Sequence, residues 1–205
     1  MIILYLLFSI LTITLLIVPT IWCYNPSLLV NLKYTTNLNI AEFKEPTLFI
    51  STHDDTFGHH DQILVCQEAI KTKLKMNIVS WDKEADSLSR LLKKLPLFPK
   101  YNLLYTGKNL VQRSIEKLEK EHLWIFLKKD WKNKGIYHIL KGLKTPVNVV
   151  FVKIINDDNV KKEDNLLSKT FNRKIKIDYN QIDDYDLKLE DQNFMEFVKS
   201  KLYYN

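Results

Sequence analysis

The sequence predicts an α/β protein with a central, largely parallel or mixed sheet flanked by helices and preceded by an N-terminal transmembrane helix. Short runs of β-branched and aromatic residues alternate with longer segments whose apolar residues recur at helical spacing. Strands that alternate with helices are typical of a largely parallel sheet. The leader carries no charged side chain before Lys33. The 205 residues, 46% of them hydrophobic and 26% charged, suit one folded domain.

Segment 1–24, MIILYLLFSILTITLLIVPTIWCY, is predicted to be a membrane anchor. About 20 apolar residues suffice to span a bilayer. The basic start and small-residue cleavage site of a signal peptide are absent from the segment. Trp22 and Tyr24 lie at one end, where aromatic residues favour the interface. We therefore expect a single-pass membrane protein whose α/β domain, residues 35–205, lies on the basic, cytoplasmic side.

The formal charge of +6 would suit either nucleic acid or an anionic membrane surface. The apolar leader favours the membrane, so we expect membrane lipid and not nucleic acid as a partner. Two cysteines, Cys23 and Cys66, with no C-x-x-C, build neither a disulfide framework nor a zinc site, which favours a reducing compartment.

The elements follow in order after a connector, 25–46, that becomes extended. The pattern predicts strands over 47–51, 76–81, 102–106, 123–127, 147–155 and 173–179. It predicts helices over 61–75, 109–122, 136–144 and 190–202. The leucine-rich basic stretch 88–100 could lie on anionic lipid, with Arg90, Lys93 and Lys94 at the headgroups, or form a core helix with a solvated basic face.

Ionisable residues crowd directly after the first predicted strand, in the stretch THDDTFGHHD from Thr52 to Asp61. In an open α/β sheet, ligands bind outside the carboxyl ends of the strands. His53 is therefore placed where a catalytic residue is expected. Asp61 begins the following helix, where it could cap the helix, orient His53, or do both.

The chain resembles the glycerolipid acyltransferase family, of the lysophosphatidic acid acyltransferase type. That family has a strand ending in Asn-His, then four residues and an aspartate that leads into a helix; this chain has TLFISTH and then DDTFGHHDQILV. The family continues with a strand ending in Phe-Pro-Glu-Gly, a Lys-Gly step, a helix, Pro-Val and a hydrophobic strand. Here the sequence is LWIFLKKDWKNKGIYHILKGLKTPVNVVFVKI. The order of these features agrees from about residue 35 to 205.

The resemblance implies transfer of an acyl chain from an acyl thioester, such as acyl-coenzyme A, to a lysophospholipid-like hydroxyl, with no further cofactor and no metal. His53 would be the general base and Asp61 its partner, with Asp54 or Asp55 as substitutes for Asp61. Phosphate-binding cations would be Lys108, Lys128, Lys129 and Lys134, of which Lys108 is the nearest cation to the family's arginine.

Two other functions compete with acyl transfer. Thr52 stands where the family has asparagine, and the sequence Phe126-Leu127-Lys128-Lys129 replaces Phe-Pro-Glu-Gly. These replacements favour an inactive, lipid-binding relative. The other alternative is a metal-dependent hydrolase, because histidine and aspartate are good ligands for zinc or iron. However, Phe57 and Gly58 occupy positions where the Thr-His-x-His-x-Asp-His pattern needs aspartate and histidine.

Overall fold

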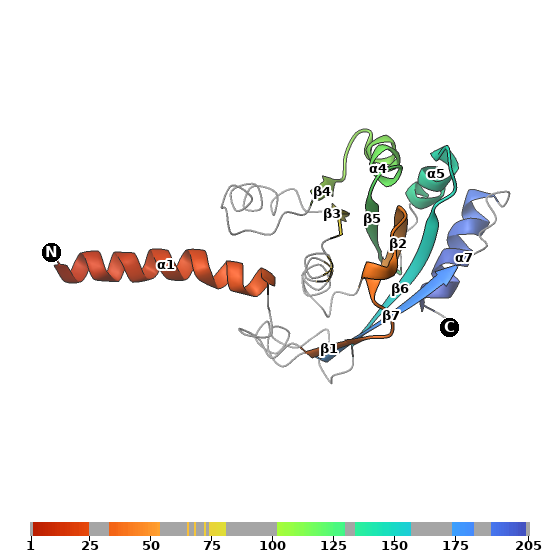
Figure 1. Ribbon diagram of the computed structural model, residues 1–205. Helices are drawn as coiled ribbons and strands as arrows, with labels where there is room; N and C mark the ends of the chain where they lie inside the picture. Colours follow the sequence, from red (N-terminus) through yellow and green to blue (C-terminus); the bar gives the residue numbers. More distant parts are fainter. Residues whose placement is uncertain are drawn as a thin grey trace.

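The computed structural model describes residues 2–24, 33–53, 65, 68, 72, 74–80, 102–129, 134–156, 174–182 and 190–203. It is an α/β fold with a mixed sheet flanked by helices, which confirms the predicted class (Figure 1). Several predicted features lie outside these residues. They are Asp54, Asp55, His59, His60, Asp61, Cys66, the stretch 88–100 and most of the helix expected over 61–75.

In the described part of the chain, the sheet has seven strands in the order β1-β7-β6-β2-β5-β3-β4. The strands are β1 (Lys33–Thr36), β2 (Thr47–Thr52), β3 (Met76–Ser80), β4 (Asn102–Tyr105), β5 (His122–Leu127), β6 (Asn148–Asn156) and β7 (Lys174–Ile182). From β6 to β4 all neighbouring strands are parallel. Among the described strands, β7 alone runs antiparallel to a neighbour, β6, and β1 then pairs parallel with β7.

The central strands β2 and β5 are buried along their whole length. Every residue of TLFIST and HLWIFL is covered because helices or loops pack on both faces of this part of the sheet. Parallel strands covered on both faces have near-continuous apolar sequences rather than alternating ones. This is why the predicted strands 47–51 and 123–127 are confirmed almost residue for residue.

One face of the sheet, which we call the α4 face, packs against α4 (Leu110–Leu118), α5 (Gly135–Gly142) and α7 (Asp191–Tyr203). Leu48 and Ile50 of β2 and Ile125 of β5 join the core on this face. The opposite face, which we call the Trp124 face, buries Trp124 with Phe49, Phe126 and strand β7. Ile40 of the short 3-10 helix η2 (Ile40–Glu42) and Val65 complete this second core. Successive residues of a strand alternate between the two cores.

The leader forms α1 (Ile2–Tyr24), which extends away from the sheet (Figure 1). Its side chains are described for residues 3–14, and all twelve of these are exposed. They include large apolar side chains that are 54–76% exposed, such as Ile3 and Ile13. Among the residues whose side chains the structure describes, which in α1 are residues 3–14, no helix is long and apolar enough to cross a membrane.

Candidate active site at the carboxyl edge of the sheet

The backbone carbonyl of Leu127 joins three elements at the edge where the parallel strands end. Leu127 is the last residue of β5 and pairs with Thr52 of β2. Its carbonyl oxygen accepts a hydrogen bond from the His53 backbone N–H at 3.1 Å. It also accepts a hydrogen bond from the Tyr203 hydroxyl near the end of α7. These bonds hold His53 beside the chain that leaves β5.

The imidazole of His53 is half-buried and packs edge-on against the Phe126 ring, with 6.0 Å between ring centroids. Phe126 is 1% exposed and belongs to the core on the Trp124 face. The His53 ring therefore lies on that face of the sheet, partly accessible to solvent. A half-buried imidazole at the end of a central strand could take and return a proton.

Thr52 has a structural role in this arrangement. Its hydroxyl donates to the Ile154 carbonyl at 3.3 Å and accepts from the Ile154 N–H at 2.9 Å. The side chain thus continues the β2–β6 pairing by one position, and it is buried. This pairing fixes the direction in which the chain enters His53.

The four lysines that were predicted to bind phosphate lie in three different places, and only two of the lysines are next to His53. Lys128 and Lys129 follow β5 directly, beside His53, and both are exposed. Lys108 is exposed in the turn after β4, at the same edge of the sheet but three strands away from β2, which is about 14 Å at the usual strand spacing. The sheet thus places Lys128 and Lys129, but not Lys108, next to His53.

Lys134 lies immediately before α5 and forms an ion pair with Asp191 at the start of α7, with 2.7 Å between Nζ and Oδ1. The hydrogen bond from Lys134 lowers the pKa of the Asp191 carboxyl below its usual value. The ammonium therefore connects two helices of the α4 face. An anionic ligand would compete with Asp191 for this lysine.

Residues of the types that bind metals do not cluster in the part of the chain that the structure describes. Among those residues, no three side chains of histidine, cysteine, aspartate or glutamate are grouped so that they could hold a metal ion. His122 and His138, the histidines described besides His53, lie on different elements, β5 and α5.

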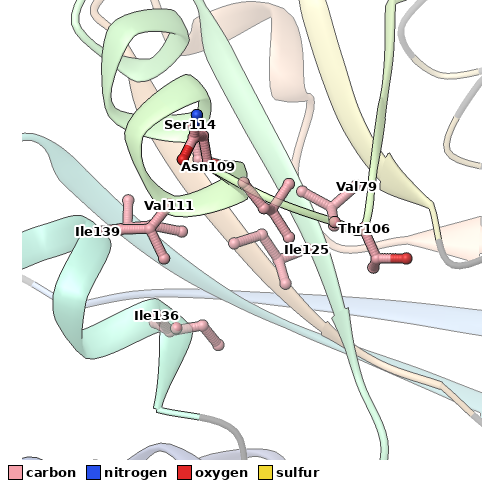
Figure 2. A pocket seen from close by; sticks show the side chains of 11 residues that line it. Val79, Thr106, Asn109, Val111, Ser114, Ile125, Ile136 and Ile139 are labelled. Carbon is pink, nitrogen blue, oxygen red and sulfur yellow. The ribbon is translucent and has the colours of Figure 1, made fainter.

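A second feature, which the sequence analysis missed, is an apolar pocket of about 310 Å³ on the α4 face (Figure 2). It lies between α4, α5 and the sheet, with Val111, Ile125, Ile136 and Ile139 among its walls. Ser114 lies on the inner side of α4, between Val111 and Leu118. A lone hydroxyl within the apolar stripe of a helix was the sequence signal that could have indicated this site.

Comparison with known proteins leaves the resemblance to the acyltransferases as a hypothesis. No family model matches this chain. A search of curated proteins also finds no match.

Proposed function

We propose that this protein is a membrane-anchored acyltransferase that moves an acyl chain from an acyl thioester to the hydroxyl of a lysophospholipid-like acceptor. The observation that carries the proposal is the hydrogen bond from the backbone N–H of His53 to the backbone carbonyl of Leu127. It fixes the His53 backbone at the carboxyl end of a central strand, where the half-buried imidazole packs against Phe126 and the exposed Lys128 and Lys129 lie nearby. The resemblance of these segments to the acyltransferases supports the choice of chemistry.

In this proposal, the neutral imidazole of His53 accepts the proton of the acceptor hydroxyl as its oxygen attacks the thioester carbonyl. The C–S bond then breaks, the thiolate leaves, and the imidazolium returns the proton to the sulfur. Asp61 would hold the other ring nitrogen and stabilise the imidazolium. Lys128 and Lys129 would bind phosphate groups of the acyl donor or the acceptor as point charges.

The membrane anchor is part of the same proposal. A 23-residue helix is about 34 Å long, which exceeds a hydrocarbon core of about 30 Å. The exposed apolar side chains of residues 3–14 would then contact lipid. Such an anchor would keep the domain, proposed to be cytoplasmic, close to lipid substrates.

An inactive lipid-binding protein with the same anchor is the second candidate. It is supported by Lys128 and Lys129, which stand where the acyltransferases have a carboxylate and a glycine. The buried hydroxyl of Thr52, bonded to Ile154, also stands where they have an asparagine. Such a protein would bind the lipid without transferring the chain.

Acyl transfer by the purified full-length chain in lipid nanodiscs tests the proposal. The protein is incubated with radiolabelled acyl-coenzyme A and a panel of lysophospholipids. A positioned general base contributes about 10²–10⁴-fold in rate, so His53→Ala should lose about that factor. His138→Ala is the matched control, because His138 is exposed on α5, and it should keep the wild-type rate.

Two outcomes would contradict the proposal. If the folded wild-type protein transfers no label to any acceptor, the lipid-binding alternative is preferred. If transfer occurs and His53→Ala retains the full rate, the catalytic base lies elsewhere.

A further inference from the structure

We infer that the pocket between α4, α5 and the sheet is a binding site for a neutral, medium-length aliphatic molecule that carries one hydrogen-bonding group, such as a fatty alcohol. This site is separate from the candidate active site. His53 packs against Phe126, on the Trp124 face, whereas the pocket is lined by Ile125, on the α4 face. The inference does not depend on acyl transfer.

The hydroxyl of Ser114 is the observation that points to a ligand. Ser114 is 0% exposed, lines the pocket, and its Oγ has no hydrogen-bond partner. A buried serine on a helix usually bonds the carbonyl four residues earlier, which would be that of Leu110. No such bond forms here. An unpaired buried hydroxyl is destabilising, and a ligand that supplied an acceptor or donor would remove that cost.

The lining defines the chemistry of the ligand. None of the described residues that line the pocket is ionisable, and most are valine, leucine or isoleucine. A charged group placed against Ser114 would be desolvated with no partner of opposite charge. The polar group of the ligand must therefore be neutral, and the rest of it apolar.

The volume sets the length of the ligand. A cavity of about 150 Å³ is known to hold a six-carbon ring. The 310 Å³ of this pocket would therefore hold about a dozen carbon atoms. The exposed turn residues Gly107 and Asn109 also line the pocket and so form its mouth, whereas Ser114, Ile136 and Ile139 are buried and form its floor. A chain of eight to about twelve carbons could reach Ser114 from outside.

Photolabelling tests the inference on the full-length protein in nanodiscs. The probe is 3-azioctanol, an eight-carbon alcohol with a photoreactive diazirine, and labelled peptides are mapped by mass spectrometry. Labelling should be saturable, should concentrate on segments 106–114 and 135–139, and should fall when excess 1-octanol competes. Labelling that rises linearly and spreads over α1 would mean partition into lipid only and would overturn the inference.

Two variants separate the hydroxyl from the cavity. Ser114→Ala keeps the space and removes the hydrogen bond, so the concentration for half-saturation by the alcohol should rise about two- to tenfold. Labelling by the same diazirine without a hydroxyl should not change. If both probes respond equally to Ser114→Ala, the assigned role of Ser114 is wrong.

Filling the cavity should abolish saturable labelling. Ile139→Phe adds side-chain volume at the floor of the pocket. If that variant does not fold, Val111→Phe fills the pocket from α4 instead. Gln112→Phe is the matched control, because Gln112 is exposed on α4 and does not line the pocket. The control should label like the wild type. Saturable labelling of the same segments in folded Ile139→Phe or Val111→Phe would place the site elsewhere.

Discussion

A buried hydrogen bond between Trp124 and Ser51 links the two central strands, β5 and β2, shortly before they reach the candidate site. The indole Nε1–H donates to Ser51 Oγ at 2.8 Å, and both residues are 0% exposed. The Trp124 ring also stacks on Phe49, with centroids 5.0 Å apart. Because a buried donor without a partner is costly, this one bond makes Ser51 important to the core.

Ser51→Ala should lower the free energy of unfolding by about 1–3 kcal/mol, because it leaves the indole N–H buried and unpaired. In a Trp124→Phe background the same change should cost less, since that donor is gone. Denaturant unfolding of the four proteins in the cycle measures this coupling. Ser200→Ala, on α7, is the control for loss of a serine hydroxyl bonded to a carbonyl. Equal costs of Ser51→Ala in both backgrounds would contradict the interpretation.

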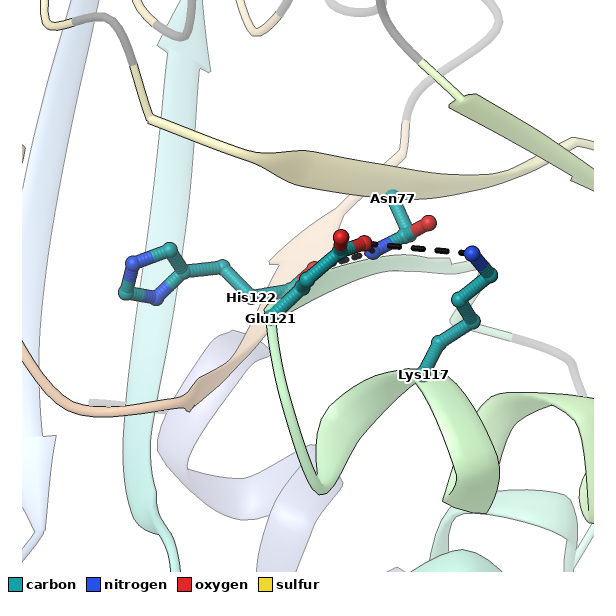
Figure 3. A network of polar contacts seen from close by, with 4 residues as sticks. All are labelled: Asn77, Lys117, Glu121 and His122. Atoms are coloured by element: carbon teal, nitrogen blue, oxygen red, sulfur yellow. Dashed lines mark hydrogen bonds and ion pairs between the residues drawn. The ribbon is translucent and has the colours of Figure 1, made fainter.

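His122, at the start of β5, gives the protein a pH-sensitive position in its core. It is 6% exposed, its Nδ1 is buried without a hydrogen-bond partner, and burial lowers its pKa below the usual 6.5. Figure 3 shows its ring pointing away from Glu121. The Glu121 carboxylate instead accepts a hydrogen bond from the Asn77 side chain at 2.9 Å and lies 3.9 Å from Lys117.

The stability of the protein should therefore fall as the pH falls below about 6.5. In that range the unfolded chain binds a proton at His122 that the folded chain resists, and proton binding by the unfolded state lowers stability. Melting temperature against pH, from 8 to 5, measures the effect. His122→Phe should reduce the loss in acid, whereas His138→Phe, on the surface, should not. An identical pH profile for wild type and His122→Phe would refute this role.

At the scale of elements, the turn before α4 depends on a strained residue. Asn109 has φ 64°, in the left-handed region, and its side chain makes no capping hydrogen bond. Left-handed backbone costs an ordinary L-residue roughly 1–2 kcal/mol, and asparagine and glycine tolerate it best. The turn sets the position of α4 and of the pocket mouth.

Asn109→Ala should lower the melting temperature, because alanine tolerates a positive φ less well than asparagine does. Asn109→Gly should come close to the wild type, since glycine adopts this conformation without a steric penalty. Thermal unfolding of the full chain in detergent compares the two. Gln112→Ala, two residues further along α4, controls for the loss of an exposed amide. An alanine variant as stable as the glycine variant would show that the turn relaxes.

Most elements could be predicted because their signals are local. The apolar runs of β2, β5 and β6 and the helical spacing of α4 and α7 each lie within one segment. The pairing of β1 could not be predicted, because its sequence, KYTT, has no apolar run and becomes a strand through its parallel pairing with β7. Helix α4 ends at Leu118, four residues before the predicted end, because His122 already belongs to β5.

The candidate site, too, could be predicted from the sequence only in part. The position of His53 after a buried strand was visible in the sequence, and the structure confirms that position. Its neighbours were not predictable, because the hydrogen bond to Leu127 spans more than seventy residues and depends on β2 lying beside β5. The ion pair of Lys134 with Asp191 likewise depends on how α5 and α7 pack.

At the scale of the whole molecule, the main question is what covers α1. In water, the exposed apolar side chains of residues 3–14, such as Leu7 and Leu11, would associate with other apolar surfaces. Its sequence has no acidic residue in the first turn and no basic residue in the last. A helix that is apolar all round is buried either in a core or in a bilayer. None of the described side chains of α1, residues 3–14, belongs to either core of the α/β domain.

We therefore expect the full-length chain to stay with the membrane pellet after carbonate extraction. Replacing Leu7 and Leu11 with aspartate should release it, because each charge near the middle of a span costs about 2.5–3.5 kcal/mol. The matched control replaces the same two residues with alanine, which should leave the chain in the pellet. Recovery of the wild-type chain in the carbonate supernatant would show that α1 is no anchor. Retention of the aspartate variant would mean that another part of the chain holds the protein to the membrane.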